Sequence, residues 1–551
     1  MSVGAWSHFW IAHLTGVLVK RFLTRSGPVV IASIILPLAA CTVGPDFVPP
    51  DALVANKFIG ANDRSVRTDR QDYRDWWRAF RDPTLNRIVQ IAYDQNLTLL
   101  SAGTRVLQAR AVLGIAVGLS YPQVQQGIGS LTYNQASAAT PLAPPNSDPT
   151  RFWANSLAAQ AAWELDFWGK FRRGVESADA SYLASIATYD QVLVTLMGDV
   201  AATYIGIRIA ERLISVARDN VRRQTKELEI VQLRFHAGDT SELDVFQATN
   251  VLEATRATIP QLEIQLQQGL DALCVLLGIA PQPLGKLLAT SRGIPVPPYT
   301  ISVGIPADLL RRRPDIRAAE LAALAQSAQI GIAESQLYPA ISISGTFGGT
   351  ASTANGHNLG QIFARTGVAY AAGPAFQWNI LNYGQITNNV RLQDATLQQL
   401  LVDYQNAVLA AQQQVDDGIS AFLQSRSQVE YLRRSTDAAS GALRLATLQY
   451  EKGATNFTTV LTAEQNLLQA ESSLASAVGN VALGATAIYR ALGGGWQIRE
   501  DSNFVTAATR DQMRARTNWG NLLAPAGQPQ PPAPGLPSPA DVGPLVRLPE
   551  W

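Results

Sequence analysis

Cysteine, histidine and methionine are scarce in this chain of 551 residues, which contains two, four and three of them. Two cysteines cannot build a disulfide framework, and so few cysteines and histidines leave little for a metal centre. Cys274 lies in an apolar run and is expected to be a small buried side chain. The sequence also lacks a glycine-rich phosphate loop, a Ser–His–Asp set and a Cys–His cluster. We therefore expect no cofactor, no metal site and no enzymatic activity.

An excess of one charge is also missing. The chain has 44 Lys and Arg residues against 43 Asp and Glu residues, a net charge of +1. Nucleic-acid binding driven by a basic field is therefore not expected. Beyond the N-terminal region, no apolar run reaches the ~18–20 residues that a membrane-spanning helix needs. A membrane protein of this composition must be anchored or form a β-barrel.

Proline is absent from two long stretches, one between Pro149 and Pro260 and one between Pro374 and Pro525. Because proline breaks helices, long helices can run there. Both stretches contain apolar residues at alternating spacings of three and four, which indicates a coiled-coil seam. Pro260 lies inside the first seam and is expected to kink its helix. The seams are Val245, Ala248, Leu252, Thr255, Ile259, Leu262 and Leu266, and Val460, Ala463, Leu467, Ala470, Leu474, Ala477 and Val481.

The two stretches belong to an internal duplication. Several features recur about 215 residues later, which indicates one architectural unit copied and fused. The matched pairs are Gly114-Ile115-Ala116 with Gly331-Ile332-Ala333, Tyr121-Pro122 with Tyr338-Pro339, Trp163 with Trp378, Gly169 with Gly384, Gly238 with Gly453, and Leu277-Gly278 with Leu492-Gly493.

Gly238 and Gly453 lie where two long helical hairpins are expected to turn. Glycine can adopt the positive φ that ends a helix. A helix from Gly169 to Gly238 would be ~100 Å long at 1.5 Å per residue.

Alternating segments precede each hairpin. Ile341, Ile343 and Phe347 alternate with serine and threonine, and the apolar residues of Val368–Ile380 alternate with small or polar residues. In the first repeat Trp153–Glu164 alternates clearly, whereas Pro122–Tyr133 is a weaker case. Such two-faced segments are typical of outer-membrane strands. The polar segments 134–151 and 351–366 are expected to be exposed loops.

Four strands cannot close a barrel, since ~8 is about the smallest number that does. Open strand edges are not tolerated in lipid. If these are membrane strands, the chain must oligomerise.

The N-terminus resembles a secretory signal. Lys20, Arg21 and Arg25 precede an apolar stretch that ends in Leu38-Ala39-Ala40-Cys41. These last four residues resemble a bacterial lipobox, whose cysteine becomes the acylated first residue. Thr42 follows it, and the absence of aspartate there favours the outer membrane.

Taken together, these features resemble the TolC-like outer-membrane factors, in the lipoprotein (NodT-type) branch that serves resistance–nodulation–division efflux pumps. The resemblance extends from Cys41 to about Gly495. It is carried by Cys41-Thr42-Val43-Gly44-Pro45-Asp46, Trp76-Trp77 with Phe80, Asp82-Pro83, Arg234-Phe235 with Gly238 to Asp244, Arg311-Arg312-Arg313-Pro314-Asp315-Ile316, and Gly453-Ala454-Thr455-Asn456.

The resemblance implies a mixed α and β membrane protein that forms a homotrimer. Three chains would make a 12-stranded outer-membrane β-barrel, continued by a long periplasmic α-helical barrel with a mixed equatorial region. It further implies a periplasmic adaptor and an inner-membrane transporter as partners, outer-membrane lipid around the barrel, and a passive duct to the exterior. Lipidation is expected at Cys41. The expected adaptor contacts are Gly238, Asp239, Thr240, Ser241, Asp244, Gly453, Ala454, Thr455 and Asn456.

Some family members narrow the tunnel with aspartate rings, but the matching positions here are Thr459 and Thr462. Their first-repeat equivalents are Asp244 and Gln247, so these four residues are the candidates for the constriction. Asp239, Glu242 and Asp244 could supply acid instead. We expect a constriction that depends less on charge.

Other readings stay open from sequence. A coiled-coil envelope lipoprotein without a channel would explain the helices but not the strands. Arg311–Arg313 could bind an anion, although ion-paired arginines at a helix start are commoner. Glu164 and Asp166 could be a catalytic pair, but the second repeat has Asn379 and Leu381 there.

The expected organisation runs from a signal peptide to a flexible tail. The boundaries are 1–40 for the signal peptide, 41–100 for the lipid-anchored segment and start of the first helix, 101–280 for repeat 1 (strands about 121–167, hairpin about 169–277), 281–310 for a proline-rich link, 311–495 for repeat 2 (strands about 339–382, hairpin about 384–492), and 496–551 for a C-terminal tail, flexible from about 525.

Overall fold

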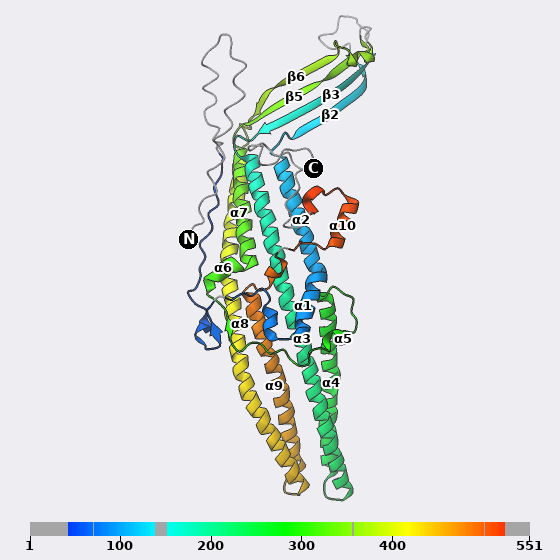
Figure 1. Ribbon diagram of the computed structural model, residues 1–551, viewed down its shortest axis with the longest axis vertical. Helices are drawn as coiled ribbons and strands as arrows, with labels where there is room; N and C mark the ends of the chain where they lie inside the picture. The colour runs from blue at the N-terminus through cyan, green and yellow to red at the C-terminus, as the bar shows by residue number, and fades with distance from the viewer. Residues whose placement is uncertain (1–41, 70, 138–150, 355–357, 501, 524–551) are drawn as a thin grey trace.

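The computed structural model describes residues 42–69, 71–137, 151–354, 358–500 and 502–523. The expected signal peptide, Cys41 and the tail from residue 524 lie outside the described residues. The molecule is elongated, with a sheet at one end and two helical hairpins at the other (Figure 1).

The elements follow the order of the duplication. The helices are α1 (Pro83–Gln95), α2 (Leu97–Gly118), α3 (Lys170–His236), α4 (Glu242–Leu276), α5 (Gly285–Leu288), α6 (Leu309–Arg312), α7 (Pro314–Ser335), α8 (Gln385–Glu451), α9 (Phe457–Ala491) and α10 (Ala507–Arg516). The strands are β1 (Val66–Arg67), β2 (Val124–Gln135), β3 (Arg151–Leu165), β4 (Ile301–Ser302), β5 (Ala340–Ser352) and β6 (Val368–Gln377).

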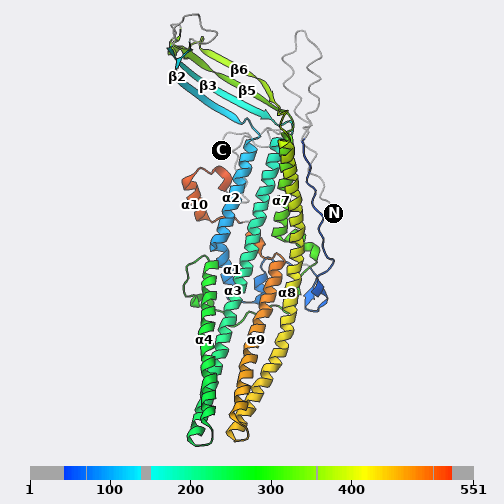
Figure 2. The same cartoon turned by 180° about the vertical axis from the view of Figure 1, so that it is seen from behind.

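The two repeats have matching helices. α3 and α8 each have 67 residues, α4 and α9 each have 35, and α2 and α7 each have 22. α3 pairs with α4, α8 pairs with α9, and α3 contacts α9 along the centre. Figures 1 and 2 show α4 and α8 at the two flanks of this row of four helices. α4 runs on through Pro260 as one helix.

The four long strands form one antiparallel sheet in the order β2-β3-β5-β6. β2 and β6 are its two edges. Pro374 lies in β6, where an edge strand tolerates the missing donor. The prediction that this strand reaches Ile380 was wrong, because it ends at Gln377. Beyond it, the Ile380 N–H donates to the Trp378 carbonyl at 3.1 Å, so the chain turns there towards α8.

The register gives the sheet one apolar and one polar face. Directly paired residues of antiparallel strands point to the same side. The apolar face carries Leu131, Tyr133, Trp153, Leu157, Trp163, Ile343, Phe347, Tyr370 and Phe376, all exposed in the single chain. The other face carries Gln126, Ser130, Ser156, Gln160, Ser342, Ser344 and Thr346.

The largest buried core lies midway along the helices. There Trp76 stacks on Tyr489 of α9 with ring centroids 5.1 Å apart, and both side chains are buried. Trp76 and Trp77 therefore pack the N-terminal segment onto the helices, as expected. β1 pairs in parallel with β4, which joins this segment to the link between the repeats.

Two further features concern helices. α10 packs on α2 through a small cluster of Leu107, Val505, Met513 and Leu523, so part of the expected tail is folded onto the helices.

Among the described helices, α3 alone contains a segment apolar and long enough by composition to cross a membrane. Of that segment 61% is buried inside the chain, which fits a central packing helix.

Candidate functional site

The hairpins turn at the end of the molecule farthest from the sheet (Figure 1). Gly238 has φ 82° and Gly453 has φ 72°, values that favour glycine. The Gly238 N–H donates to the Phe235 carbonyl at 3.0 Å, and the Asp239 N–H donates to the Arg234 carbonyl at 2.9 Å. The same two bonds recur at the second turn, so both helix ends are closed by a Schellman motif.

The helices that leave the turns are capped by side chains. The Asp244 N–H donates to the Ser241 hydroxyl at 3.4 Å, and the Asp244 carboxylate accepts from the Ser241 N–H at 3.3 Å and from the Thr240 hydroxyl. This is a capping box. At the second turn the Asn456 side chain accepts from the Thr459 N–H at 3.2 Å and from the Thr459 hydroxyl at 2.9 Å. Asp244 and Thr459 thus take part in equivalent local caps.

The other two constriction candidates lie one turn further along. Gln247 is half-buried, and its Oε1 has no hydrogen-bond partner among the described residues. Thr462 is exposed, and its hydroxyl donates to the Thr458 carbonyl at 2.9 Å. The predicted tip residues are exposed or half-buried: Gly238, Asp239, Thr240, Ser241, Asp244, Gly453, Ala454, Thr455 and Asn456.

A groove of about 940 Å³ runs between α8 and α9 above the second turn. Thr459 and Thr462 line it, together with Asn456. The rest of its lining, within the described chain, is alanine, leucine, serine, threonine, asparagine and glutamine, without a carboxylate. This groove offers hydroxyl and amide groups rather than charge.

One contact that the sequence did not indicate ties the two hairpins together near the tips. Arg234 of α3 donates to the main-chain carbonyl of Tyr450 on α8, and its guanidinium lies 4.5 Å from the centroid of the Tyr450 ring. The Tyr450 hydroxyl donates to the Thr240 hydroxyl at 3.5 Å. Tyr450 also packs on Phe457, with ring centroids 5.3 Å apart. These bonds hold the tips of one chain side by side.

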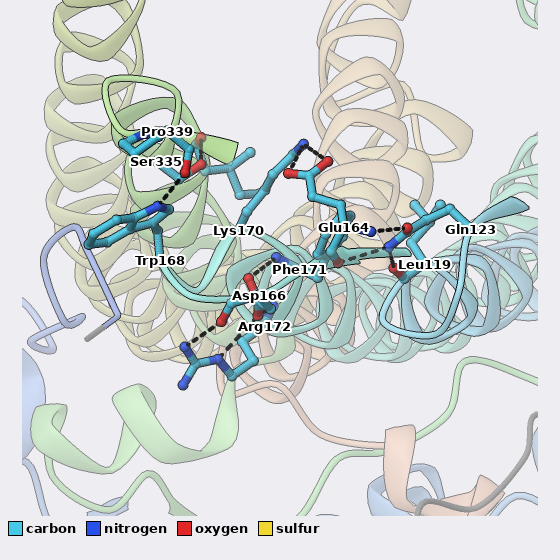
Figure 3. A network of polar contacts seen from close by, with 11 residues as sticks. Leu119, Gln123, Glu164, Asp166, Trp168, Lys170, Phe171, Arg172, Ser335 and Pro339 are labelled. Carbon is cyan, nitrogen blue, oxygen red and sulfur yellow. Dashed lines mark hydrogen bonds and ion pairs between the residues drawn. The ribbon is translucent and has the colours of Figure 1, made fainter. Parts of the chain in front are cut away.

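Glu164 and Asp166 lie at the junction between sheet and helices (Figure 3). The Asp166 carboxylate accepts from the N–H groups of Phe171 and Arg172 at 3.1 and 3.0 Å, and so caps α3, whose preceding Gly169 has no side chain. Glu164 forms an ion pair with Lys170 at 2.9 Å. Both carboxylates therefore have structural partners, which argues against the catalytic reading.

The N-terminal segment is held at this same junction. Arg173, with a side chain only 4% exposed, donates to the carbonyls of Val43 and Gly44 at 3.3 and 3.2 Å and to Asp46 at 2.8 Å. The Val43 N–H donates to the Trp168 carbonyl at 3.1 Å. Cys41 lies outside the described residues, but the chain that follows it is fixed where the sheet meets the helices.

The arginine cluster before α7 is also structural. Arg313 is buried and donates to the Ala491 carbonyl at 2.7 Å and to Gln414 at 2.9 Å, and it pairs with Asp315. The Arg312 guanidinium lies 4.4 Å from the centroid of the Tyr73 ring. These partners favour a helix start with paired arginines over an anion site.

Comparisons with known proteins agree with this architecture. The sequence model of the "Outer membrane efflux protein" family matches residues 88–279 and 305–494, one segment in each repeat. Nodulation protein T of Rhizobium leguminosarum bv. viciae is 31% identical over 473 residues, which cover 85% of this chain and 93% of that protein. The pyoverdine export outer membrane protein OpmQ of Pseudomonas putida is 31% identical, over 77% of this chain and 88% of that protein.

The solved structure of the outer-membrane channel OprN superimposes with a TM-score of 0.77 at 32% identity, covering 83% of this chain and 100% of that one. The predicted fold class is thereby confirmed, and so is the family resemblance. Since the family model matches more than half of the sequence and both repeats carry it, this chain belongs to the outer membrane efflux protein family.

Proposed function

We propose that this chain is the outer-membrane channel of a tripartite efflux pump in a Gram-negative bacterium. Three copies conduct substrates passively from a periplasmic adaptor and an inner-membrane transporter to the exterior. The observation that carries the proposal is the two-faced sheet, whose apolar face suits lipid and whose polar face suits a water-filled lumen.

The two edges of the sheet support the trimer. β2 and β6 have unpaired main-chain groups on their outer sides, and lipid offers these groups no partner. Three chains of four strands give twelve strands, enough to close a barrel, whereas one chain falls short of the ~8 strands needed. The same three-fold assembly places α4 of one chain beside α8 of the next and closes a tunnel of twelve helices.

The rival readings explain less. A coiled-coil lipoprotein that only tethers the envelope has no use for a sheet with an exposed apolar face. Catalysis is not part of the proposal, since the carboxylates that could suggest it, Glu164 and Asp166, are engaged in an ion pair and a helix cap. Transport energy comes from the inner-membrane partner.

The tips of the hairpins are the proposed contact with the adaptor. They are exposed, and they lie at the opposite end from the membrane sheet. The bonds between Arg234 and Tyr450 hold the two tips of each chain together, so we assign them to the resting, narrow state of the tunnel.

Replacing Arg234 with alanine is expected to loosen the tips, because the variant loses both the bond to the Tyr450 carbonyl and the contact with its ring. Planar-bilayer recording of the purified trimer should show larger and longer openings than in the wild type. The control is Arg222→Ala, since Arg222 is exposed and, among the described residues, its ion-pair partner is Asp219 on its own helix. Equal currents in the wild type, Arg234→Ala and Arg222→Ala would show that Arg234 does not help to keep the tunnel closed. An absence of channel activity in all three proteins would contradict the proposed function.

We also propose that the constriction near Asp244, Gln247, Thr459 and Thr462 is set by packing more than by charge. Ion selectivity measured from reversal potentials should then be unchanged in Thr462→Ala. Thr462→Asp would add a ring of three carboxylates to the trimer and should increase selectivity for cations. Strong cation selectivity that Thr462→Ala abolishes would refute this part of the proposal.

Lipidation at Cys41 is the third proposed feature. Arg173 holds residues 43–46 at the junction between sheet and helices, so an acyl chain on Cys41 would enter the membrane beside the barrel. Cells fed radioactive palmitate should label the wild type but not Cys41→Ser. Cys274→Ser should keep the label, because Cys274 is buried in the core. Label retained in Cys41→Ser would show that the acyl chain is attached elsewhere, and an unlabelled wild type would show that the chain is not lipidated.

A further inference from the structure

A layer of polar side chains, some buried and some partly exposed, lies between α3 and α9, halfway between the core and the tips. The Asn220 amide donates to Glu471 at 2.8 Å, and Arg223 donates to the same carboxylate at 2.7 Å. The two helices are antiparallel, so two turns towards the tip on each helix bring Glu227 opposite Glu464. One turn further, Val231 and Val460 share an apolar cluster, which agrees with this register.

Glu464 is a buried carboxyl group without a full set of partners. Its side chain belongs to a residue only 3% exposed, and Oε1 has no hydrogen-bond partner among the described residues. Gln224, also 3% exposed, has neither amide atom bonded there. Arg223, the cation in the layer, is already bonded to Glu471. A charged carboxylate in this position is costly, because burial removes its water and supplies no cation of its own.

The surroundings of Glu464 favour its protonated form. The pKa of Glu464 is raised to about 8, chiefly by burial and also by the charge of Glu227, while the charge of Arg223 lowers it. Burial also raises the pKa of Glu227, which the hydroxyl of Thr447 on α8 lowers and Glu451 raises. α4 contributes apolar residues to the neighbouring cluster, Val245, Ala248 and Val251.

The carboxyl pair has no counterpart in the duplicated position. Residues 215 positions away are Ala442 for Glu227 and Thr249 for Glu464, on α8 and α4. In the proposed trimer those two helices face a neighbouring chain. The seam within each chain would therefore respond to pH, while the equivalent seam between chains would not.

We propose that Glu227 and Glu464 form a proton-sensitive contact that couples pH to the spacing of the two hairpins. With Glu464 protonated, α3 and α9 pack closely. When both carboxylates are charged, their repulsion moves α3 and α9 apart in the part of the hairpins between this pair and the tips. Only the consequence for transport, a wider tunnel end, rests on the proposed function.

The direction of the effect follows from proton linkage. The packed arrangement holds the Glu464 proton more tightly than a solvated glutamate does, whose ordinary pKa is 4.5. Packing is therefore favoured most below pH 4.5. It weakens as the pH rises, and reaches its minimum above about 8.

Spin labels on the seam test the proposal in the full-length trimer in lipid nanodiscs. Lys226 of α3 and Gln465 of α9 are exposed and lie at the level of the pair, so the variant Lys226→Cys/Gln465→Cys reports their spacing. The distance between the two labels of the same chain, which is the shortest label-to-label distance in the trimer, should increase between pH 5 and pH 9. Adding Glu464→Gln should fix it at the value for pH 5. The control Glu253→Gln changes an exposed carboxylate of α4 that pairs with Arg256, and should keep the response.

A distance that is constant from pH 5 to pH 9, or one that still changes in Glu464→Gln, would overturn the proposal. If Glu464→Gln does not assemble, Glu227→Gln replaces it. That variant removes a charge that raises the Glu464 pKa, so its transition should move to lower pH, and an unmoved transition would count against the pair. The distance between the labels is measured without any ion current through the channel. A pH-dependent distance in a protein without channel activity would therefore refute the proposed function but not the proton-sensitive contact.

Discussion

The unpaired edges of the four-stranded sheet are the constraint on which the rest of the structure depends. A main-chain N–H or C=O group left without a partner in hydrocarbon costs several kcal/mol, and β2 and β6 each present a row of them. The apolar face of the sheet is stable in contact with lipid, whereas the main-chain groups at the two edges are stable there only when another strand pairs with them. Both demands are met when copies of the chain join edge to edge, and that arrangement also brings α4 and α8 of different chains together.

The helical part follows from the same duplication but uses its two copies differently. The turns at Gly238 and Gly453 are closed by the same Schellman bonds, and the hairpins have equal length because their helices have 67 and 35 residues in both repeats. We expect gating and partner choice to depend on the positions where the copies differ. Inside each chain, Arg234 of α3 is bonded to Tyr450 of α8, and α3 and α9 carry the carboxyl pair Glu227 and Glu464. The helices α8 and α4, which face neighbouring chains in the proposed trimer, have alanine and threonine at the positions equivalent to that pair. Each chain can thus adjust its own hairpins without breaking the barrel.

Periodicity and repetition made most of this fold predictable. The proline-free stretches and repeated glycines placed the long helices and their turns, and alternation placed β3 and β5. The sequence could not show that β6 stops at Gln377, because Trp378 and Ile380 continue the alternation while the chain already turns. Asp244 was a candidate for the constriction, but only the turn geometry reveals its capping box. Glu464 was missed because one glutamate beside an apolar seam suggests a solvated edge. Its helical spacing from Val460, Leu467 and Glu471 places it on the same face of α9, which was the available signal. Its burial results from the packing of α3 against that face.

The pairing of β2 in one chain with β6 in another is the most direct test of the account. A single cysteine at Tyr370 of β6, combined with cysteines placed one at a time along β2 from Val124 to Gln135, should form disulfides in membranes at one register. The denatured product should then reach three linked chains and no more. Absence of any cross-link along β2, or cross-linking confined to single chains, would contradict a barrel closed by three copies.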